Sequence, residues 1–170
     1  MAYQEAWDDL WHRSAVVLPT ARAELIAHWV RHFAEDAHFR ALVVAEADRL
    51  LAALPLVRRR IKGLFPAADL PINPWSPNGE LLMDESADVA KVLQCLCQGF
   101  GQMGWPMLWI DTVPVQSFRW QHLVSETQKM GLFPQVHWRY PGGLVHWEDF
   151  SAYWASRPSG LQKKIRKYLR

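Results

Sequence analysis

Hydrophobic positions along this chain follow two patterns, one typical of helices and the other of strands. Apolar residues that recur three and four positions apart predict amphipathic helices, whereas short unbroken apolar runs predict buried strands. The helical pattern covers residues 3–13, 20–33, 84–100, 118–130 and 159–169. The strand pattern covers residues 41–46, 50–57, 105–113, 133–140 and 144–147. A hairpin followed by alternating helices and strands predicts an α/β fold with a mixed sheet.

Three details of this pattern make specific predictions. Thr20 precedes the second helical stretch and is its candidate N-cap. Pro55 lies inside the second apolar run of the hairpin, and because proline cannot donate a ladder hydrogen bond, it predicts a sheet edge or a bulge there. The near-continuous apolar run at residues 105–113 predicts an inner strand covered on both faces.

The last helix carries an apolar face that needs a covering surface. Ser159 followed three residues later by Gln162 predicts a capping box at its start. The apolar face consists of Leu161, Ile165, Tyr168 and Leu169. A helix of about a dozen residues is marginal alone in water, and each large apolar group gains ~1.5–3 kcal/mol on burial. We therefore expect this face to dock either on this domain or on a further part of the protein.

The formal net charge of +2 combines two parts of opposite sign. Residues 1–156 carry 13 basic and 17 acidic groups, whereas residues 157–170 carry 6 basic groups and no acidic one. The basic end has three possible roles: the solvated face of a docked helix, a contact with nucleic acid or an anionic membrane, or the first helix of a second domain.

Composition excludes several classes of protein. Half of the residues are hydrophobic and ten are tryptophan, which favours a packed domain over a disordered chain. No apolar run approaches the ~18–20 residues of a transmembrane helix. The acidic start does not resemble a signal peptide, so we expect a cytoplasmic protein. Cys95 and Cys97 lie two apart on a predicted helix and cannot readily form a disulfide.

Sequence motifs for cofactors and metals are weak. Gly99, Gly101 and Gly104 match the dinucleotide-binding pattern G-x-G-x-x-G, but a helix precedes them and a strand follows, which is the reverse of the order needed. We interpret them as a glycine-rich helix exit. The seven histidines are scattered, so no metal site is predicted. No nucleophile elbow or Walker loop is present.

Five segments, by their order and spacing, resemble one family. They are Ala41-Leu-Val-Val-Ala, Leu51-Ala-Ala-Leu-Pro-Leu-Val-Arg-Arg-Arg60, Asn73-Pro-Trp-Ser-Pro77, Trp109-Ile-Asp111 and Phe150-x-x-Tyr-x-x-Ser-Arg with the basic helix after it. The chain resembles, from about Trp29 to Arg170, the GNAT-type acyltransferases of the FemAB-like or cellulose-biosynthesis CelD-like group. The resemblance implies a mixed, mainly antiparallel GNAT-like sheet flanked by helices.

Members of that group have two GNAT-like halves, and the second half carries the acyl-CoA site. The resemblance implies that residues 1–156 form the amino-terminal GNAT-like domain and that residues 157–170 are the opening helix of a second, absent one. The chain lacks the GNAT pyrophosphate turn Q/R-x-x-G-x-G/A. Its nearest approach, Gln98-x-x-Gly101-x-Met103, has a bulky residue where a small one is needed. We therefore expect acetyl-CoA or another acyl-CoA to be the donor of the complete protein and none to bind this chain.

The implied function is the acceptor side of acyl transfer to an amine or hydroxyl. The candidate acceptor-binding residues are Asn73, Trp75, Ser76, Asn78 and Asp111. Trp75 capping the core and Asp111 capping a turn are their ordinary structural roles, and no catalytic residue is assigned. The implied partners are the second GNAT domain and a small-molecule, saccharide or peptide acceptor, with no nucleic acid. The alternative is a stand-alone binding module whose basic terminal helix meets an anionic polymer or membrane.

Overall fold

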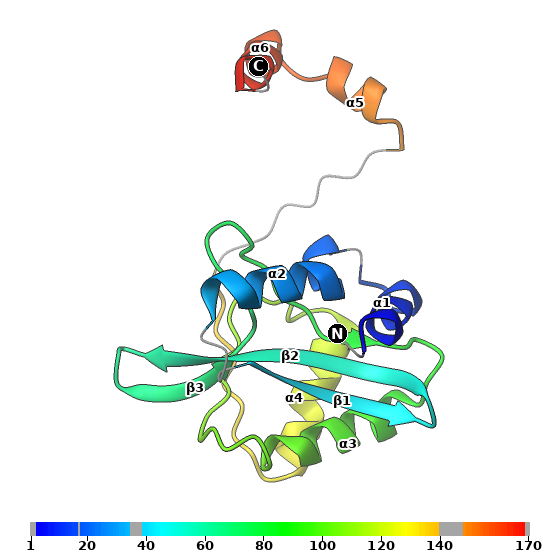
Figure 1. Cartoon of the computed structure of the whole chain (residues 1–170), viewed down its shortest axis with the longest axis vertical. Coiled ribbons are helices and arrows are strands. Elements are labelled where there is room, and N and C mark those ends of the chain that lie inside the picture. The colour runs from blue at the N-terminus through cyan, green and yellow to red at the C-terminus, as the bar shows by residue number, and fades with distance from the viewer. Residues whose placement is uncertain (1–2, 17, 35–38, 140–147, 169–170) are drawn as a thin grey trace. The chain divides into compact units, whose positions relative to one another are not determined.

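The computed structural model describes residues 3–16, 18–34, 39–139 and 148–168 (Figure 1). The chain forms two compact units, Met1–His137 and Trp138–Arg170. The first unit contains helices α1 (Gln4–Arg13), α2 (Ala23–Phe33), α3 (Val89–Phe100) and α4 (Phe118–Lys129), a 3-10 turn η1 (Pro19–Ala21), and strands β1 (Phe39–Glu46), β2 (Arg49–Ile61), β3 (Phe65–Asp69) and β4 (Leu82–Met83). The predicted α/β fold with a mainly antiparallel sheet flanked by helices is confirmed.

Strand β2 is the centre of the sheet. It pairs with β1 along one edge, as the predicted hairpin requires, and with β4 and then β3 along the other, always antiparallel. Pro55 is therefore not at a sheet edge, and the bulge lies elsewhere. On the second edge, β4 pairs with β2 up to Ala53 and β3 begins at Val57, so Pro55 lies in the gap between these two partners. A proline fits there because, although Ala41 of β1 pairs with it on one side, no partner strand lies opposite it on the side of β3 and β4.

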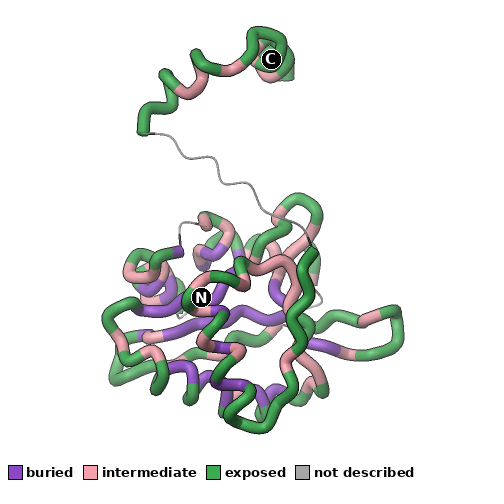
Figure 2. The backbone as a smooth tube through the Cα atoms, turned by 180° about the vertical axis from the view of Figure 1, so that it is seen from behind, coloured by how far each residue is buried: buried purple, intermediate pink, exposed green. Residues whose placement is uncertain are grey.

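A bulge in β2 at Leu51 decides which residues face which helices. Ala45 pairs with Leu50 and Val44 with Ala52, so Leu51 has no partner on β1 and the alternation changes by one residue. Beyond it, Ala52, Leu54 and Leu56 pack with α3 and α4. Leu50 and Ala53 pack with α1 and α2 instead. Figure 1 shows the two helix pairs on opposite sides of the sheet, and Figure 2 shows β2 buried between them.

Polar contacts from α1 fix the start of α2. The indole nitrogens of Trp7 and Trp11 donate to the carbonyl oxygens of Ala21 and Leu18, at 2.9 and 3.0 Å. The carboxylate of Asp8 accepts the backbone N–H of Ala23, the first residue of α2, at 3.0 Å. The prediction of Thr20 as N-cap is therefore wrong.

A buried carboxylate joins α1 to the loop before α3. Asp84 is 2% exposed and accepts hydrogen bonds from Arg13 and, at 2.6 Å, from Arg49. The hydroxyl and backbone N–H of Ser86 also donate to it, at 2.7 and 3.0 Å. Burial alone raises the pKa of Asp84, but these hydrogen bonds and the charge of Arg13 outweigh burial, so its pKa lies below the usual value.

The two helices that cover the second face form as the sequence predicts. The side chain of Asp88 caps α3 by accepting the backbone N–H of Lys91. Helix α4 ends at Lys129, and Gly131 follows with φ +78°, a left-handed conformation typical of a helix C-terminus.

Two strand predictions are wrong over the described residues. The run at 105–113 is not a regular inner strand: none of its residues is fully buried, and a single parallel bridge joins Leu108 to Ala68 of β3. Residues 133–139 form no strand either. Tyr140 and the strand predicted at 144–147 lie outside the described residues. Apolar composition alone did not separate buried strands from exposed extended segments, because both consist of large apolar residues.

The second unit contains helices α5 (Phe150–Ala155) and α6 (Ser159–Tyr168), and neither has a fully buried residue. The domain boundary predicted between residues 156 and 157 falls between these two helices. The start of α6 is as predicted, but its capping differs. The carbonyl oxygen of Pro158 accepts the backbone N–H of Gln162, and the amide side chain of Gln162 donates to the carbonyl oxygens of Trp154 and Arg157, at 3.0 and 2.9 Å.

We expect Asp84→Ala to lower the free energy of unfolding by about 3 kcal/mol at neutral pH, because Arg13, which is only 21% exposed, and both donors of Ser86 lose their buried acceptor. Urea denaturation measures this change. Because the pKa of Asp84 is lowered on folding, its stabilising contribution is present above the usual value of 3.8 and is lost as the pH falls through the folded pKa.

Asp9→Ala is the matched control, since Asp9 pairs with the same Arg13 at 2.9 Å but its side chain is exposed. Its loss of stability should stay below about 1 kcal/mol. Equal effects of the two substitutions would contradict a special role for the buried carboxylate.

Candidate functional site

The candidate site begins where β3 and the extended segment at residues 107–111 separate. The two run parallel for one rung only. The backbone N–H of Ala68 donates to the carbonyl oxygen of Met107, and the N–H of Trp109 donates back to the carbonyl oxygen of Ala68, both at 2.8 Å. No further bridge between the two segments is present in the described part of the chain.

The carboxylate of Asp69 occupies the position of the next rung. A regular parallel ladder would continue through the backbone N–H groups of Leu70 and Asp111. Here, one carboxylate oxygen of Asp69 accepts both of them, at 2.8 and 3.2 Å. The carbonyl oxygen of Leu70 accepts the N–H of Ile72 instead, at 2.8 Å. Asp69 therefore ends the pairing and holds the two segments together at the point where they part.

Burial dominates the electrostatics of Asp69. The residue is 1% exposed, and burial raises its pKa above the usual value despite hydrogen bonds from Arg59, Asp111 and Leu70. Its second carboxylate oxygen pairs with the guanidinium of Arg59, which is half-exposed on β2. A carboxylate so enclosed cannot touch a substrate itself. Its role is to position Asp111 and the loop that starts at Leu70.

Asp111 lies next to Asp69 and is half-buried. Its carboxylate accepts a hydrogen bond from the hydroxyl of Thr112 at 3.2 Å. Thr112 has φ +55°, an uncommon conformation for a β-branched residue. Backbone strain of this kind persists only where the surroundings impose it, and it is concentrated at functional sites. The carboxylate of Asp111 is thus presented from a constrained turn rather than from a mobile loop.

Three of the predicted acceptor residues form one tight turn. The side-chain oxygen of Asn73 accepts the backbone N–H groups of Trp75 and Ser76, at 2.9 and 2.8 Å. The backbones of Asn73 and Ser76 also exchange two hydrogen bonds at 3.0 Å. Trp75 is 91% exposed at the tip, so it does not cap the core. An indole held in water by a rigid turn is available for recognition, because little conformational entropy is lost when it binds.

The loop that carries this turn is fixed at both ends. Asp69 holds its start, as described above. At its other end, a Cβ built on Gly79 would lie 2.6 Å from the Cβ of Leu70. Only glycine allows the backbone to approach this buried leucine so closely. The loop is therefore closed on itself, with the Asn73 turn between its two ends.

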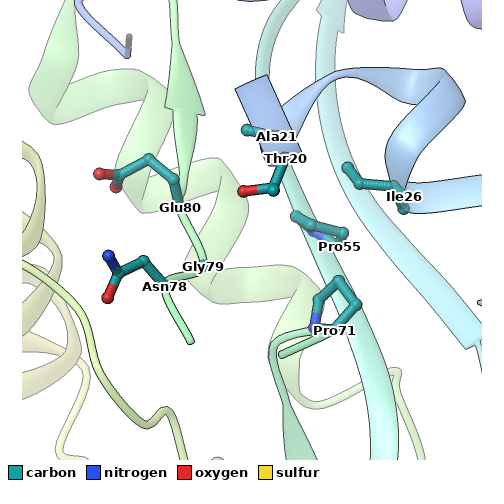
Figure 3. Close-up of a pocket in the computed structure, with 8 residues that line it drawn as sticks. All are labelled: Thr20, Ala21, Ile26, Pro55, Pro71, Asn78, Gly79 and Glu80. Atoms are coloured by element: carbon teal, nitrogen blue, oxygen red, sulfur yellow. The ribbon is translucent and has the colours of Figure 1, made fainter. Parts of the chain in front are cut away.

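Asn78 differs from the other candidates because it lines a small recess (Figure 3). The lining residues are Thr20, Ala21, Ile26, Pro55, Pro71, Asn78, Gly79 and Glu80. Its volume of about 10 Å³ holds at most one water molecule, so it is not an acyl or acceptor pocket. The carboxylate of Glu80 is turned away from it and accepts hydrogen bonds from Trp120 and Arg119, at 2.6 and 3.1 Å.

The structure thus places the sequence-predicted residues in three places. Asn73, Trp75 and Ser76 share a turn, Asn78 lines the recess, and Asp111 is bound to Asp69. Sequence reasoning missed Asp69 because residues 64–80 contain four prolines, a composition typical of loops rather than strands. The pair Lys62-Gly63 between two extended runs was the signal for a second hairpin, with Asp69 at its far end.

No family model matches this chain, and no curated protein or solved structure is significantly similar to it. Within the described residues, no group of three or more histidine, cysteine or acidic side chains could hold a metal ion. None of the described helices combines the length and hydrophobicity that crossing a bilayer demands.

We expect Asp69→Ala to lower the free energy of unfolding by about 2–4 kcal/mol, because two backbone N–H groups lose their acceptor. Asp69→Asn keeps a side-chain oxygen at the same place and should cost about 1 kcal/mol or less. Urea denaturation of both variants measures the difference. If both substitutions destabilise the protein equally, the charge pair with Arg59 holds β3 and residues 107–111 together, and the hydrogen bonds from the backbone N–H groups of Leu70 and Asp111 do not.

The pH dependence of the free energy of unfolding further separates the backbone hydrogen bonds of Asp69 from its charge pair with Arg59. The folded pKa of Asp69 is raised, so its favourable contribution relative to the Asp69→Asn variant is full below the usual value of 3.8. That contribution is lost as the pH rises through the folded pKa. A stability difference between the wild type and Asp69→Asn that grows with rising pH would contradict this assignment.

Proposed function

We propose that this chain is the acceptor-side half of a cytoplasmic GNAT-type acyltransferase, which moves an acyl group from acyl-CoA to an amine or hydroxyl. The donor site belongs to a second GNAT-like domain. The proposal combines the resemblance described above with the α/β fold of the first unit. The missing pyrophosphate turn is consistent with a half that does not bind the donor.

The observation that carries the proposal is the constrained edge at the end of β3. From this edge, Asp69 fixes two recognition groups of different chemistry, the half-buried carboxylate of Asp111 and the loop that presents Trp75. A carboxylate attracts an ammonium group or accepts a hydrogen bond that a hydroxyl donates. An exposed indole stacks on a sugar ring or an alkyl chain, or contacts a cation through its face. These are the groups an amine, saccharide or peptide acceptor offers.

In acyl transfer, the acceptor nitrogen or oxygen attacks the thioester carbonyl, the acceptor loses a proton, and the CoA thiolate leaves. The enzyme contributes mainly by aligning acceptor and donor and by stabilising the oxyanion. Under the proposal, Asp111 and Trp75 supply the acceptor half of that alignment. The oxyanion donors and the contacts to CoA come from the second domain.

The second unit by itself does not cover the apolar face of α6. Within this unit, α6 has no fully buried residue, and Leu161 on its apolar face is 43% exposed. Exposed apolar faces of this kind are typical of surfaces that pack on a further domain. We propose that the second GNAT domain covers it.

We expect the reading frame to continue beyond the codon for Arg170 for a further ~150–200 residues that include a GNAT pyrophosphate turn. This chain by itself should show no tight binding in a calorimetric titration with acetyl-CoA. A micromolar dissociation constant would contradict the division into donor and acceptor halves. A stop codon after Arg170 would favour the alternative, a binding module that uses α6.

In the product of the complete reading frame, Trp75→Ala and Asp111→Asn should each raise the KM for an amine acceptor about tenfold or more and leave the KM for acetyl-CoA unchanged. Thiol release from CoA measures both constants. Phe133→Ala is the control, since Phe133 is also a highly exposed aromatic residue but lies outside the loop. An equal effect of Phe133→Ala, or a change confined to the KM for acetyl-CoA, would overturn the assignment of this edge to the acceptor.

A further inference from the structure

A β-hairpin extends beyond the helices that cover the sheet. It consists of the second half of β2 and all of β3, paired from Val57 with Asp69 to Ile61 with Phe65. Figure 1 shows it leaving the body at one end of the sheet, and Figure 2 shows its tip exposed from the opposite side. The base of the hairpin belongs to the core, since Ala67 and Ala68 are buried, but residues 58–66 are exposed or half-buried and extend beyond it.

The tip is a tight turn that presents two apolar side chains to solvent. Lys62 and Gly63 both have positive φ, at +50° and +72°, and the backbone N–H of Leu64 donates to the carbonyl oxygen of Ile61 at 3.1 Å. Leu64 is 74% exposed and Phe65 is 60% exposed. Two large neighbouring apolar residues at the end of a projecting hairpin are unfavourable in water and indicate a contact surface.

Basic residues stand directly behind this tip. Residues 58–68 include four cations, Arg58, Arg59, Arg60 and Lys62, and no acid. Arg59 pairs with Asp69 at the base of the hairpin. Within the described part of the chain, no ion pair involves Arg60 or Lys62. Since residues 1–156 carry more acids than bases, the hairpin is a cationic projection on an otherwise acidic body.

We propose that the tip of this hairpin, residues 58–65, docks on an anionic lipid surface. The grouping of these side chains fits a membrane interface. Leu64 in the turn and Phe65 beside it are exposed and enter the boundary between headgroups and acyl chains. Lys62 lies in the same turn and Arg60 one residue before the last cross-strand pair, and their long side chains extend back to the phosphates.

The same grouping disfavours nucleic acid as the partner. A phosphate backbone would bind Arg60 and Lys62 but would leave the exposed side chains of Leu64 and Phe65 without an apolar contact. Arg58 and Arg60 project from one face of the hairpin, because successive residues of a strand alternate. Ile61 and Phe65, which pair across it, share the other face with Arg59. Apolar and basic groups therefore lie side by side at the end of the hairpin, as a planar boundary between acyl chains and phosphates requires.

Flotation of the full chain with lipid vesicles tests the proposal. We expect binding to phosphatidylcholine vesicles that contain phosphatidylserine and weak binding to vesicles of phosphatidylcholine alone. Leu64→Ser combined with Phe65→Ser should lower the partition coefficient about tenfold or more. Arg60→Gln combined with Lys62→Gln should lower it by about fivefold for each cation removed. Circular dichroism of each variant verifies folding.

Two matched controls make the result decisive. Leu132 and Phe133 are an identical exposed pair outside the hairpin, so Leu132→Ser combined with Phe133→Ser should leave binding unchanged. Lys163→Gln combined with Lys164→Gln removes the same charge from α6. If the α6 variant abolishes flotation and the hairpin variants do not, α6 is the membrane contact and the proposal is overturned.

Three other outcomes would also overturn the proposal. One is the absence of flotation with anionic vesicles, which would indicate that the hairpin contacts a protein instead of a lipid surface. The second is equal flotation with neutral vesicles. The third is tight binding to duplex DNA at the same ionic strength that depends on Arg60 and Lys62 and not on Leu64 and Phe65. Because none of these measurements involves CoA or an acceptor, they test membrane binding independently of the proposed acyl transfer.

Discussion

The fold depends on one strand that is covered on both faces and paired along both edges. Residues 52–57 of β2 are all buried, with α1 and α2 on one side and α3 and α4 on the other. The bulge at Leu51 shifts the alternation by one residue, so Leu50 and Ala53 share one core and Ala52 and Leu54 the other, and Pro55 occupies the gap between β4 and β3. Strands β1, β3 and β4 pair with this strand and helices α1 and α3 contact it, and the proposed membrane hairpin is its continuation beyond the core.

Buried carboxylates at the ends of strands then fix the loops. Asp84 joins α1 to the segment before α3, Glu80 receives the indole of Trp120 from α4, and Asp69 separates β3 from residues 107–111. A buried acid is retained only where its hydrogen bonds are satisfied, and all three meet this condition. These residues hold the polar segments in place. Asp69 in this way fixes the half-buried Asp111 and the loop that presents the exposed Trp75.

Sequence patterns predicted the helices and the first hairpin well, because these depend on local spacing. The helix predicted within residues 84–100 and observed as α3 is an example. They failed where an interaction distant in sequence replaced a local one. Asp8 on α1 caps α2 in place of Thr20. At α6, the side chain of Gln162 donates to Trp154 and Arg157 instead of forming the predicted capping box. Of the candidate site, the sequence located the Asn73 turn and Asp111 but not Asp69, whose role requires two segments separated by 42 residues.

By itself, the sequence determined the helical faces, the β1–β2 hairpin and the separation of an acidic body from a basic end, because period and charge are properties of neighbouring residues. Only the tertiary structure decided that residues 105–113 are a half-exposed segment rather than an inner strand, and that a buried carboxylate replaces a ladder rung at Asp69. An apolar run shows that burial is favourable, but which surface covers it is decided by the packing of the whole chain.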